Sequence, residues 1–358
     1  MATVAPTVRP NGLPAKEFQM PADGPLRVPI PTPDPSAKTP ESSVLTAEQQ
    51  KKYVAVLAKV SAWTTIPEST APHKPLTDSE RMWLSRECML RYLRASKWNV
   101  DQAVSRLQAT LSWRREYGAD RFTFDYISPE NETGKQLILG YDNDQRPCLY
   151  LNPGKQNTQM SDRQIEQICF MLDRAVDMLP PGQENLCLII TFKGASAGRI
   201  PTFGQARATL NILQTHNPER LGKALIQECP WFANTFFKLI SPLIDPVTRD
   251  KMNFNPVSRN FIPPAHLWAE HGGDLKFKYD HAIYWKALEK ETSARRAAIK
   301  ERWEKAGKHI GEYEGYLRGG DHPSIAAETN AADSGEKSLE QDMARGLEQD
   351  MARVTVQA

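Results

Sequence analysis

The sequence lacks an excess of charge of either sign. Its 358 residues include 45 Lys and Arg against 43 Asp and Glu, so the formal net charge is only +2. Proteins that bind nucleic acid usually carry a strongly basic surface or stripe. We therefore expect no nucleic-acid partner, and a cationic binding site has to be local.

The sequence also lacks long apolar runs and paired cysteines. No stretch approaches the roughly 20 apolar residues that cross a bilayer, and the N-terminal MATVAPTVRPNGLPAKEF has no basic segment followed by an apolar core, as a secretory signal would. The five cysteines form no CxxC pair and mostly lie within apolar runs. This pattern is typical of reduced thiols in a cytoplasmic protein, so we expect no disulfide, metal site or cofactor.

Both ends of the sequence have little apolar content. Ten of the 27 prolines lie in the first 40 residues, in segments such as PIPTPDPSAKTP. Near the other end, SLEQDMAR is followed at once by GLEQDMAR. These compositions predict a disordered arm over residues 1–45 and a disordered tail over residues 321–358. The repeat is either a simple expansion of the tail or a weak partner-binding helix.

Helical patterns follow the arm. The segment Thr77-Asp-Ser-Glu has the form of a capping box, and apolar residues continue at helical spacing to Leu93. A second helix is expected to begin at Asn99 and end near Gly118, because asparagine caps helix starts and glycine favours helix ends. We predict a helical N-terminal subdomain over residues 46–120.

Strands then alternate with helices. QLILGYD, RPCLYLNP and KALIQEC are expected strands, and NLCLIITF is a continuous apolar run typical of a strand buried on both faces. Helical patterns begin at Ser161, around ARATLNIL and after Pro230. The alternation predicts an α/β fold with a mainly parallel sheet over residues 121–285. A charged helix continues into an extension over residues 286–320; we expect a solvated face there, with a membrane or partner role as the alternative.

One local motif suggests catalysis. Gly194-Ala-Ser196-Ala-Gly198 fits the G-x-S-x-G pattern of serine hydrolases and follows an apolar strand. The hydrolase geometry requires a helix that begins at the serine, whereas Pro201 and Gly204 disrupt the two turns that follow. We expect a loop here, no catalytic residue and no enzyme, with a hydrolase using Ser196 as a distant alternative.

The helix expected after Pro230 is unusually apolar. Its large apolar side chains cover more of the circumference than an ordinary surface helix requires; they are Trp231, Phe232, Phe236, Phe237, Leu239 and Ile240. The helix either lies in the core or presents a surface that meets something other than water. Pattern alone favours the core.

Polar groups flank this helix on both sides. A polar turn with Glu219, Arg220 and Lys223 precedes it, and Thr248, Arg249 and Lys251 follow in a short helix that Asp245 is expected to cap. A hydroxyl, a guanidinium and ammonium groups near a carboxylate have the chemistry to bind a polyol phosphate. The alternative is that these side chains are solvated loop charges.

Four segments together resemble the CRAL-TRIO lipid-binding family, in particular a divergent subgroup of fungal phosphatidylinositol transfer proteins. They are RECMLRYLRASKWNVDQAVSRLQATLSWRREYG, RPCLYLNPGKQN, HNPERLGKALIQECPWFANTFFKLISPLIDPVTRDKM and HGGDLKFKYDHAIYW, which occur in consistent order between residues 77 and 290. The resemblance implies N-terminal helices beside an α/β lipid pocket. A mobile gate helix, here Trp231 to Pro242, would close that pocket.

The resemblance also implies roles for the flanking polar residues. Lys251 and Thr248 would bind the phosphate of phosphatidylinositol and Glu219 the inositol hydroxyls, while Arg220 would steady that carboxylate or reach the phosphate. Ser96 stands where a founding member of the family has a further headgroup arginine. One cationic contact is therefore expected to be missing.

The expected pocket wall is apolar where that member uses hydroxyls for phosphatidylcholine; the wall residues are Ile138, Leu149, Leu186 and Leu188. We expect a phosphatidylinositol transfer protein that handles phosphatidylcholine poorly, because an apolar wall leaves a phosphodiester unpaired. A sterol is the expected second ligand. The protein would act in the cytoplasm, at membrane surfaces and on membrane lipids. The alternative is a lipid sensor that presents phosphatidylinositol to a lipid kinase or scaffold.

Overall fold

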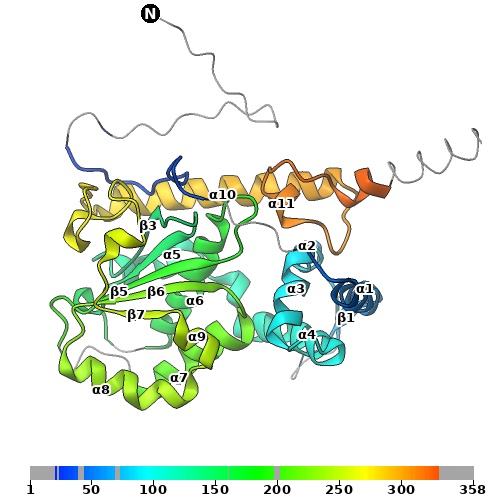
Figure 1. The fold of residues 1–358 in the computed structure, drawn as a ribbon, viewed down its shortest axis with the longest axis horizontal. Coiled ribbons are helices and arrows are strands. Elements are labelled where there is room, and N and C mark those ends of the chain that lie inside the picture. Colours follow the sequence, from blue (N-terminus) through cyan, green and yellow to red (C-terminus); the bar gives the residue numbers. More distant parts are fainter. Residues whose placement is uncertain are drawn as a thin grey trace, which may run out of the picture.

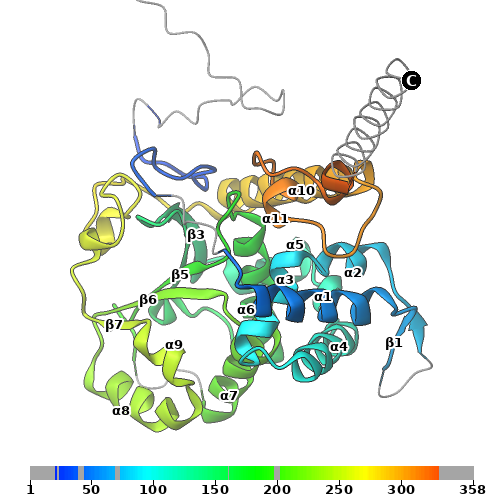
Figure 2. The same ribbon diagram turned by 45° about the vertical axis from the view of Figure 1, so that its right-hand side comes forward.

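The computed structural model describes residues 21, 24–38, 44–68, 73–159, 161–196 and 202–329. A helical unit lies beside an α/β unit, and one long helix runs along both (Figures 1 and 2). The predicted α/β class with a helical N-terminal part is confirmed. The repeat near the C-terminus lies outside the described residues.

The helical unit has four helices around its own apolar core. They are α1 (Ala47–Ser61), α2 (Asp78–Trp83), α3 (Arg86–Ala95) and α4 (Val100–Tyr117), with a small hairpin of β1 (Thr65–Ile66) and β2 (Lys74–Pro75). Asn99 caps α4 through its side chain, and Gly118 ends it in the left-handed conformation, as the sequence predicts.

The helix expected from Thr77 to Leu93 is divided in two. Thr77 and Glu80 do form the predicted capping box of α2. That helix ends at Trp83, and the hydroxyl of Ser85 accepts a bond from the backbone N–H of Cys88 to begin α3. A second N-cap therefore lies within one apolar pattern, which periodicity alone does not reveal.

A five-stranded sheet forms the centre of the α/β unit. Its strands are β3 (Gln136–Tyr141), β4 (Pro147–Leu151), β5 (Leu186–Thr191), β6 (Leu221–Gln227) and β7 (Met252–Phe254), in that spatial order. The first pair is antiparallel and the other three pairs are parallel. Parallel neighbours require crossover segments, and the intervening helices provide them.

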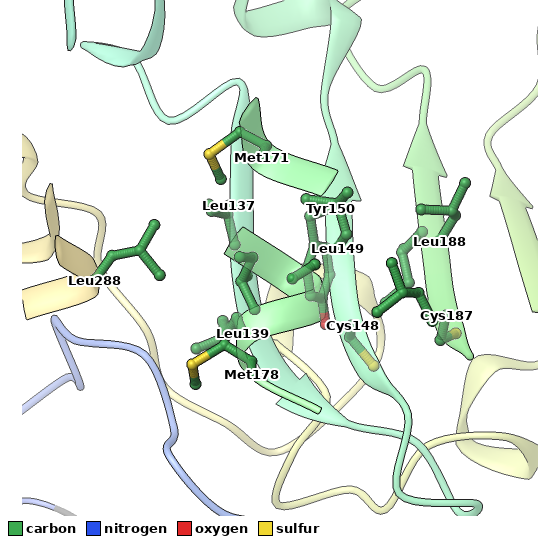
Figure 3. Close-up of a cluster of buried hydrophobic side chains, with 14 of the residues drawn as sticks. Leu137, Leu139, Cys148, Leu149, Tyr150, Met171, Met178, Cys187, Leu188 and Leu288 are labelled. Carbon is green, nitrogen blue, oxygen red and sulfur yellow. The ribbon is translucent and has the colours of Figure 1, made fainter. Parts of the chain in front are cut away.

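Helices and loops enclose this sheet. They include α5 (Phe124–Asn131), α6 (Asp162–Asp177), α7 (Phe203–Asn211), the π-helical turn η4 (Ile212–His216), α8 (Trp231–Ile240), η5 (Ser241–Leu243) and α9 (Pro246–Asp250). Ser161 occupies the N-cap position of α6 as expected, but its side chain makes no capping bond. Figure 3 shows part of the main core, a single buried cluster to which Leu149 and Leu188 of the sheet, Met171 of α6 and Leu288 of the C-terminal helix belong.

The C-terminal extension is one long helix followed by a short one. The long helix, α10 (His281–Lys305), buries Tyr284, Trp285 and Leu288 toward the α/β unit, while Trp303 is buried near its other end. The short helix α11 (Glu314–Leu317) follows. The charged face of α10 is largely exposed between these anchors.

Part of the predicted disordered arm is ordered. Leu26 and Ile30 are only 2% and 4% exposed, and Leu26 exchanges backbone hydrogen bonds with Lys276 and Lys278. The prediction of disorder is wrong for residues 24–38, because a proline-rich segment that cannot form a helix can still pair in extended form. At the other end, residues 321–329 of the predicted tail end in a helical turn.

Candidate functional site

A cavity of about 380 Å³ lies between the helical unit and the α/β unit. Its lining includes all four residues predicted to bind a lipid headgroup: Glu219, Arg220, Thr248 and Lys251. Two predicted wall residues, Leu186 and Leu188, also line it. The fold thus gathers side chains from β5, α9 and the turn before β6 around one space.

Glu219 is held in an unusual backbone conformation. Its φ is +60°, and the Asn185 side chain donates a hydrogen bond of 2.6 Å to its carbonyl oxygen. A non-glycine residue in this region costs on the order of 1 kcal/mol and persists only where the surroundings enforce it. Asn185 therefore fixes the turn that brings Glu219 to the cavity.

Thr248 and Lys251 are positioned by α9 and the sheet edge. Asp245 caps α9 by accepting bonds from the backbone N–H groups of Val247 and Thr248, as predicted. The carbonyl of Lys251 accepts a 2.9 Å bond from Ala224 in β6. This bond holds the backbone of Lys251, and with it the side chain, beside β6, the strand that follows Glu219.

The Lys251 ammonium lies 3.9 Å from the Glu219 carboxylate, and both side chains are about a quarter exposed. A partly exposed pair at this distance contributes little to stability, typically about 0–1 kcal/mol. Neither charge is locked by a short hydrogen bond to the other, so both remain able to bind a ligand.

Arg220 is directed away from Glu219. Its Nη1 donates a 2.9 Å bond to the carbonyl of Glu184, and its Nη2 lies 3.9 Å from the Glu314 carboxylate of α11. Burial, and after it the charge of Arg91, lowers the pKa of Arg220 to about 10. Among the described residues, no contact joins Arg220 to the Glu219 carboxylate, so that expected role has no support; a role at the phosphate stays a prediction.

Arg106 of α4 also lines the cavity, although no sequence pattern predicted it as a site residue. Its Nη1 donates to the carbonyl of Ala95 and its Nη2 to the carbonyl of Gln214. It occupies an ordinary helical position far from the other site residues in the chain. Only the packing of α4 against η4 reveals its position.

The four predicted wall residues lie on one face of the sheet. Ile138, Leu149 and Leu188 are direct cross-strand neighbours in β3, β4 and β5, and Leu186 is two residues from Leu188 on the same strand. Cross-strand partners share a face. All four are buried in the main core, and two of them, Leu186 and Leu188, also line the cavity.

Helix α8 has one face toward the protein and one toward solvent. Phe237 packs edge-on against Phe192 and Phe254, and Ile240 is buried in a cluster with Ala206. Phe232 and Phe236 are half-buried.

The solvent face of α8 remains strongly apolar. Trp231 and Leu239 are 77% and 60% exposed, and Leu243 and Val247 extend the exposed apolar surface along the chain. The predicted core position therefore fits the face of α8 that packs on the protein, and the predicted unpartnered surface fits its solvent face.

Ser196 is exposed on the loop after β5, and residues 197–201 that follow it lie outside the described part of the chain. The next described helix, α7, begins at Phe203. None of the histidine hydrogen bonds among the described residues reaches it. The geometry of a hydrolase nucleophile is absent from the described part of this loop.

None of the described helices combines the length and apolar character needed to cross a membrane.

Comparison with known proteins identifies the class. The sequence matches the CRAL/TRIO domain over residues 131–273 and the CRAL/TRIO N-terminal domain over residues 52–109. The chain belongs to the CRAL-TRIO family, which confirms the resemblance stated above.

Two yeast relatives are similar over most of the chain. "Phosphatidylinositol transfer protein PDR17" of Saccharomyces cerevisiae is 39% identical over 316 residues, which cover 82% of this chain and 90% of that protein. "CRAL-TRIO domain-containing protein C23B6.04c" of Schizosaccharomyces pombe is 46% identical over 302 residues; these cover 84% of this chain but only 30% of that protein. A solved structure, "Crystal structure of Sfh5", aligns with a TM-score of 0.47 at 14% identity over 61% of this chain and 84% of that one.

Proposed function

We propose that this protein transfers phosphatidylinositol between membranes. The observation that carries the proposal is the cavity in which Glu219, Thr248 and Lys251 meet beside Leu186 and Leu188. A polar end for a headgroup adjoins an apolar wall for acyl chains. The similarity to a relative named as a phosphatidylinositol transfer protein supports the same assignment.

In this proposal Lys251 and Thr248 bind the phosphate and Glu219 accepts hydrogen bonds from inositol hydroxyls. The 3.9 Å separation of Lys251 from Glu219 leaves both groups free to exchange their mutual attraction for bonds to the lipid. No covalent bond is made or broken, so the protein acts as a carrier and not as an enzyme.

Helix α8 serves as the gate. The acyl chains of a phospholipid need space beyond that of its headgroup, and none of the described residues of α8 lines the cavity. Movement of α8 away from Phe192 and Phe254 would enlarge the space over the sheet.

The exposed face of α8 supplies the membrane contact. Each buried methylene is worth about 0.8 kcal/mol, so two acyl chains exposed to water would cost tens of kcal/mol. A gate that opens only where Trp231 and Leu239 enter the bilayer interface avoids that exposure. The protein would thus work in the cytoplasm as a peripheral membrane protein.

The apolar wall sets the lipid preference. Leu186 and Leu188, the two predicted wall residues that line the cavity, offer no hydrogen bond to the phosphate of phosphatidylcholine, so that lipid is bound poorly. A sterol needs apolar walls and a single polar partner, which makes it the proposed second ligand.

The test is lipid transfer between donor and acceptor vesicles, with native mass spectrometry of the protein's bound lipid. We expect one phosphatidylinositol per chain and accelerated transfer of that lipid. Stoichiometric binding without transfer would support the sensor that presents lipid to a kinase or scaffold. A protein that takes up no phosphatidylinositol would refute the proposal.

A further inference from the structure

Arg106 is fixed at the cavity by two hydrogen bonds. Its Nη1 donates to the Ala95 carbonyl at 2.9 Å and its Nη2 to the Gln214 carbonyl at 3.1 Å, and its guanidinium lies 5.9 Å from the centre of the Tyr92 ring. Ala95, Arg106 and Gln214 all line the cavity. An arginine has five N–H donors, so three remain for another partner.

The other charges of the cavity lining already have partners. Glu219 faces Lys251, and Asp245 accepts backbone N–H bonds at the start of α9. Arg220 donates to the backbone carbonyl of Glu184 and lies 3.9 Å from the carboxylate of Glu314. Each of these groups has a counter-charge or hydrogen-bond partner within the protein.

Arg106 differs from Arg220 and Lys251 in having no carboxylate within ion-pair distance among the described residues. Its two acceptors are neutral carbonyls, which hold the guanidinium in place without cancelling its charge. Lys251 faces Glu219 and Arg220 lies near Glu314, so Arg106 is the cation of the cavity lining that no carboxylate pairs among the described residues. An anionic group such as a phosphodiester is a suitable partner for it.

We propose that Arg106 binds the phosphate of the lipid held in this cavity. The guanidinium approaches from α4, on the side of the cavity formed by the helical unit, while Lys251 approaches from the sheet. Arg106 also bonds the carbonyl of Ala95, the residue directly before Ser96. Arg106 therefore places a cation beside the C-terminal end of α3. This is the end where Ser96 stands in place of the headgroup arginine that the family resemblance led us to expect.

The inference rests on the proposed function only in requiring a phosphate-bearing lipid in this cavity. It adds that the helical unit contributes directly to binding the phosphate of the lipid. Arg106 also joins α4 to the end of α3 and to η4, so a purely structural role has to be separated from phosphate binding in any test.

The test uses the full chain with Arg106→Gln and Arg106→Lys. Each variant is equilibrated with vesicles that contain phosphatidylinositol, phosphatidylcholine, phosphatidate and diacylglycerol, and bound lipid is measured by native mass spectrometry. Arg302→Gln is the control, since Arg302 donates to the Leu317 carbonyl and does not line the cavity.

Loss of a charge-assisted contact should reduce phosphatidylinositol affinity about 10- to 100-fold in Arg106→Gln. Arg106→Lys keeps the charge and should lose less, and Arg302→Gln should match the wild type. Diacylglycerol has the same acyl chains without the phosphate, so its binding should not change.

The outcomes separate the two proposals. Unchanged phosphatidylinositol binding in Arg106→Gln, or an equal loss for diacylglycerol, would overturn the role of Arg106 and leave the proposed function standing. If the wild type selects another phospholipid and Arg106→Gln loses it, the phosphate contact is supported and the choice of phosphatidylinositol is wrong. A wild type that binds no phospholipid would overturn both.

Discussion

The Nζ of Lys251 lies 3.9 Å from a carboxylate oxygen of Glu219, although one residue ends α9 and the other precedes β6. The two side chains meet because Lys251 is bonded through its carbonyl to Ala224 of β6. The pairing of β7 with β6 therefore builds the polar end of the cavity.

Replacing either member of this pair should weaken lipid binding without unfolding the protein. We expect Lys251→Ala and Glu219→Ala to lower phosphatidylinositol affinity about tenfold or more, because each removes a contact to a charged or polyhydroxyl headgroup. The free energy of unfolding should change by less than about 1 kcal/mol, since the pair is partly exposed.

Equilibrium lipid binding and chemical denaturation measure the two effects. Lys51→Ala is the control, because Lys51 is an exposed lysine of α1 that does not line the cavity. Retention of phosphatidylinositol at the wild-type level in both site variants would show that the headgroup binds elsewhere.

Replacing two aromatic residues of α8 should have different effects, one on membrane binding and the other on stability. Trp231→Ala removes a side chain that is 77% exposed, so stability should stay within about 0.5 kcal/mol while vesicle binding and lipid transfer fall severalfold. Phe237→Ala removes contacts to Phe192 and Phe254 and should cost about 2 kcal/mol.

Vesicle sedimentation, transfer rates and denaturation midpoints measure this pair of variants. Equal loss of stability in both would mean that Trp231 packs against the protein in solution. Normal vesicle binding by Trp231→Ala would remove α8 as the membrane contact.

A hydroxyl in the cavity wall should relax selectivity. Leu188 lines the cavity and is 8% exposed, so Leu188→Ser places a hydrogen-bond donor there. We expect a higher ratio of bound phosphatidylcholine to phosphatidylinositol, measured by competition between the two lipids. Leu188→Ala creates a similar space without a hydroxyl and should leave the ratio unchanged; the same rise in both variants would point to cavity size as the cause.

Stability should fall below neutral pH in part because of His216. Its ring is stacked on Trp113 at 3.9 Å, and its Nδ1 lies 3.2 Å from the Thr110 hydroxyl. Burial lowers the pKa of His216 from 6.5 to about 4, and the charges of Arg114 and Arg106 act in the same direction.

Between pH 6.5 and 4 the unfolded chain takes up a proton at this residue while the folded chain does not. Stability is thus unaffected by His216 above pH 6.5 and declines as pH falls toward 4, by about 2 kcal/mol in total. Denaturation of wild type and His216→Gln at several pH values measures this. The variant should show a weaker decline, since burial also lowers the pKa of His271 to about 4 and this residue still contributes. Identical pH dependence would contradict the assignment.

Local patterns predicted much of the fold. The capping box at Thr77, the N-cap Asn99 and the helix end at Gly118 all appear where the sequence places them, because each depends on bonds within a few residues. The division of the first helix at Ser85 was missed, since a serine inside an apolar pattern becomes a cap only when the chain turns there.

Long-range packing decided the rest. The sequence by itself determined the α/β alternation, the family and the polar residues that flank α8, because local periodicity and capping chemistry express these directly. Only the tertiary structure decided that Arg220 turns toward Glu314, that Leu26 packs beside Phe277, and that Arg106 reaches the cavity. These positions depend on contacts between segments far apart in the chain, whose energies no local pattern records.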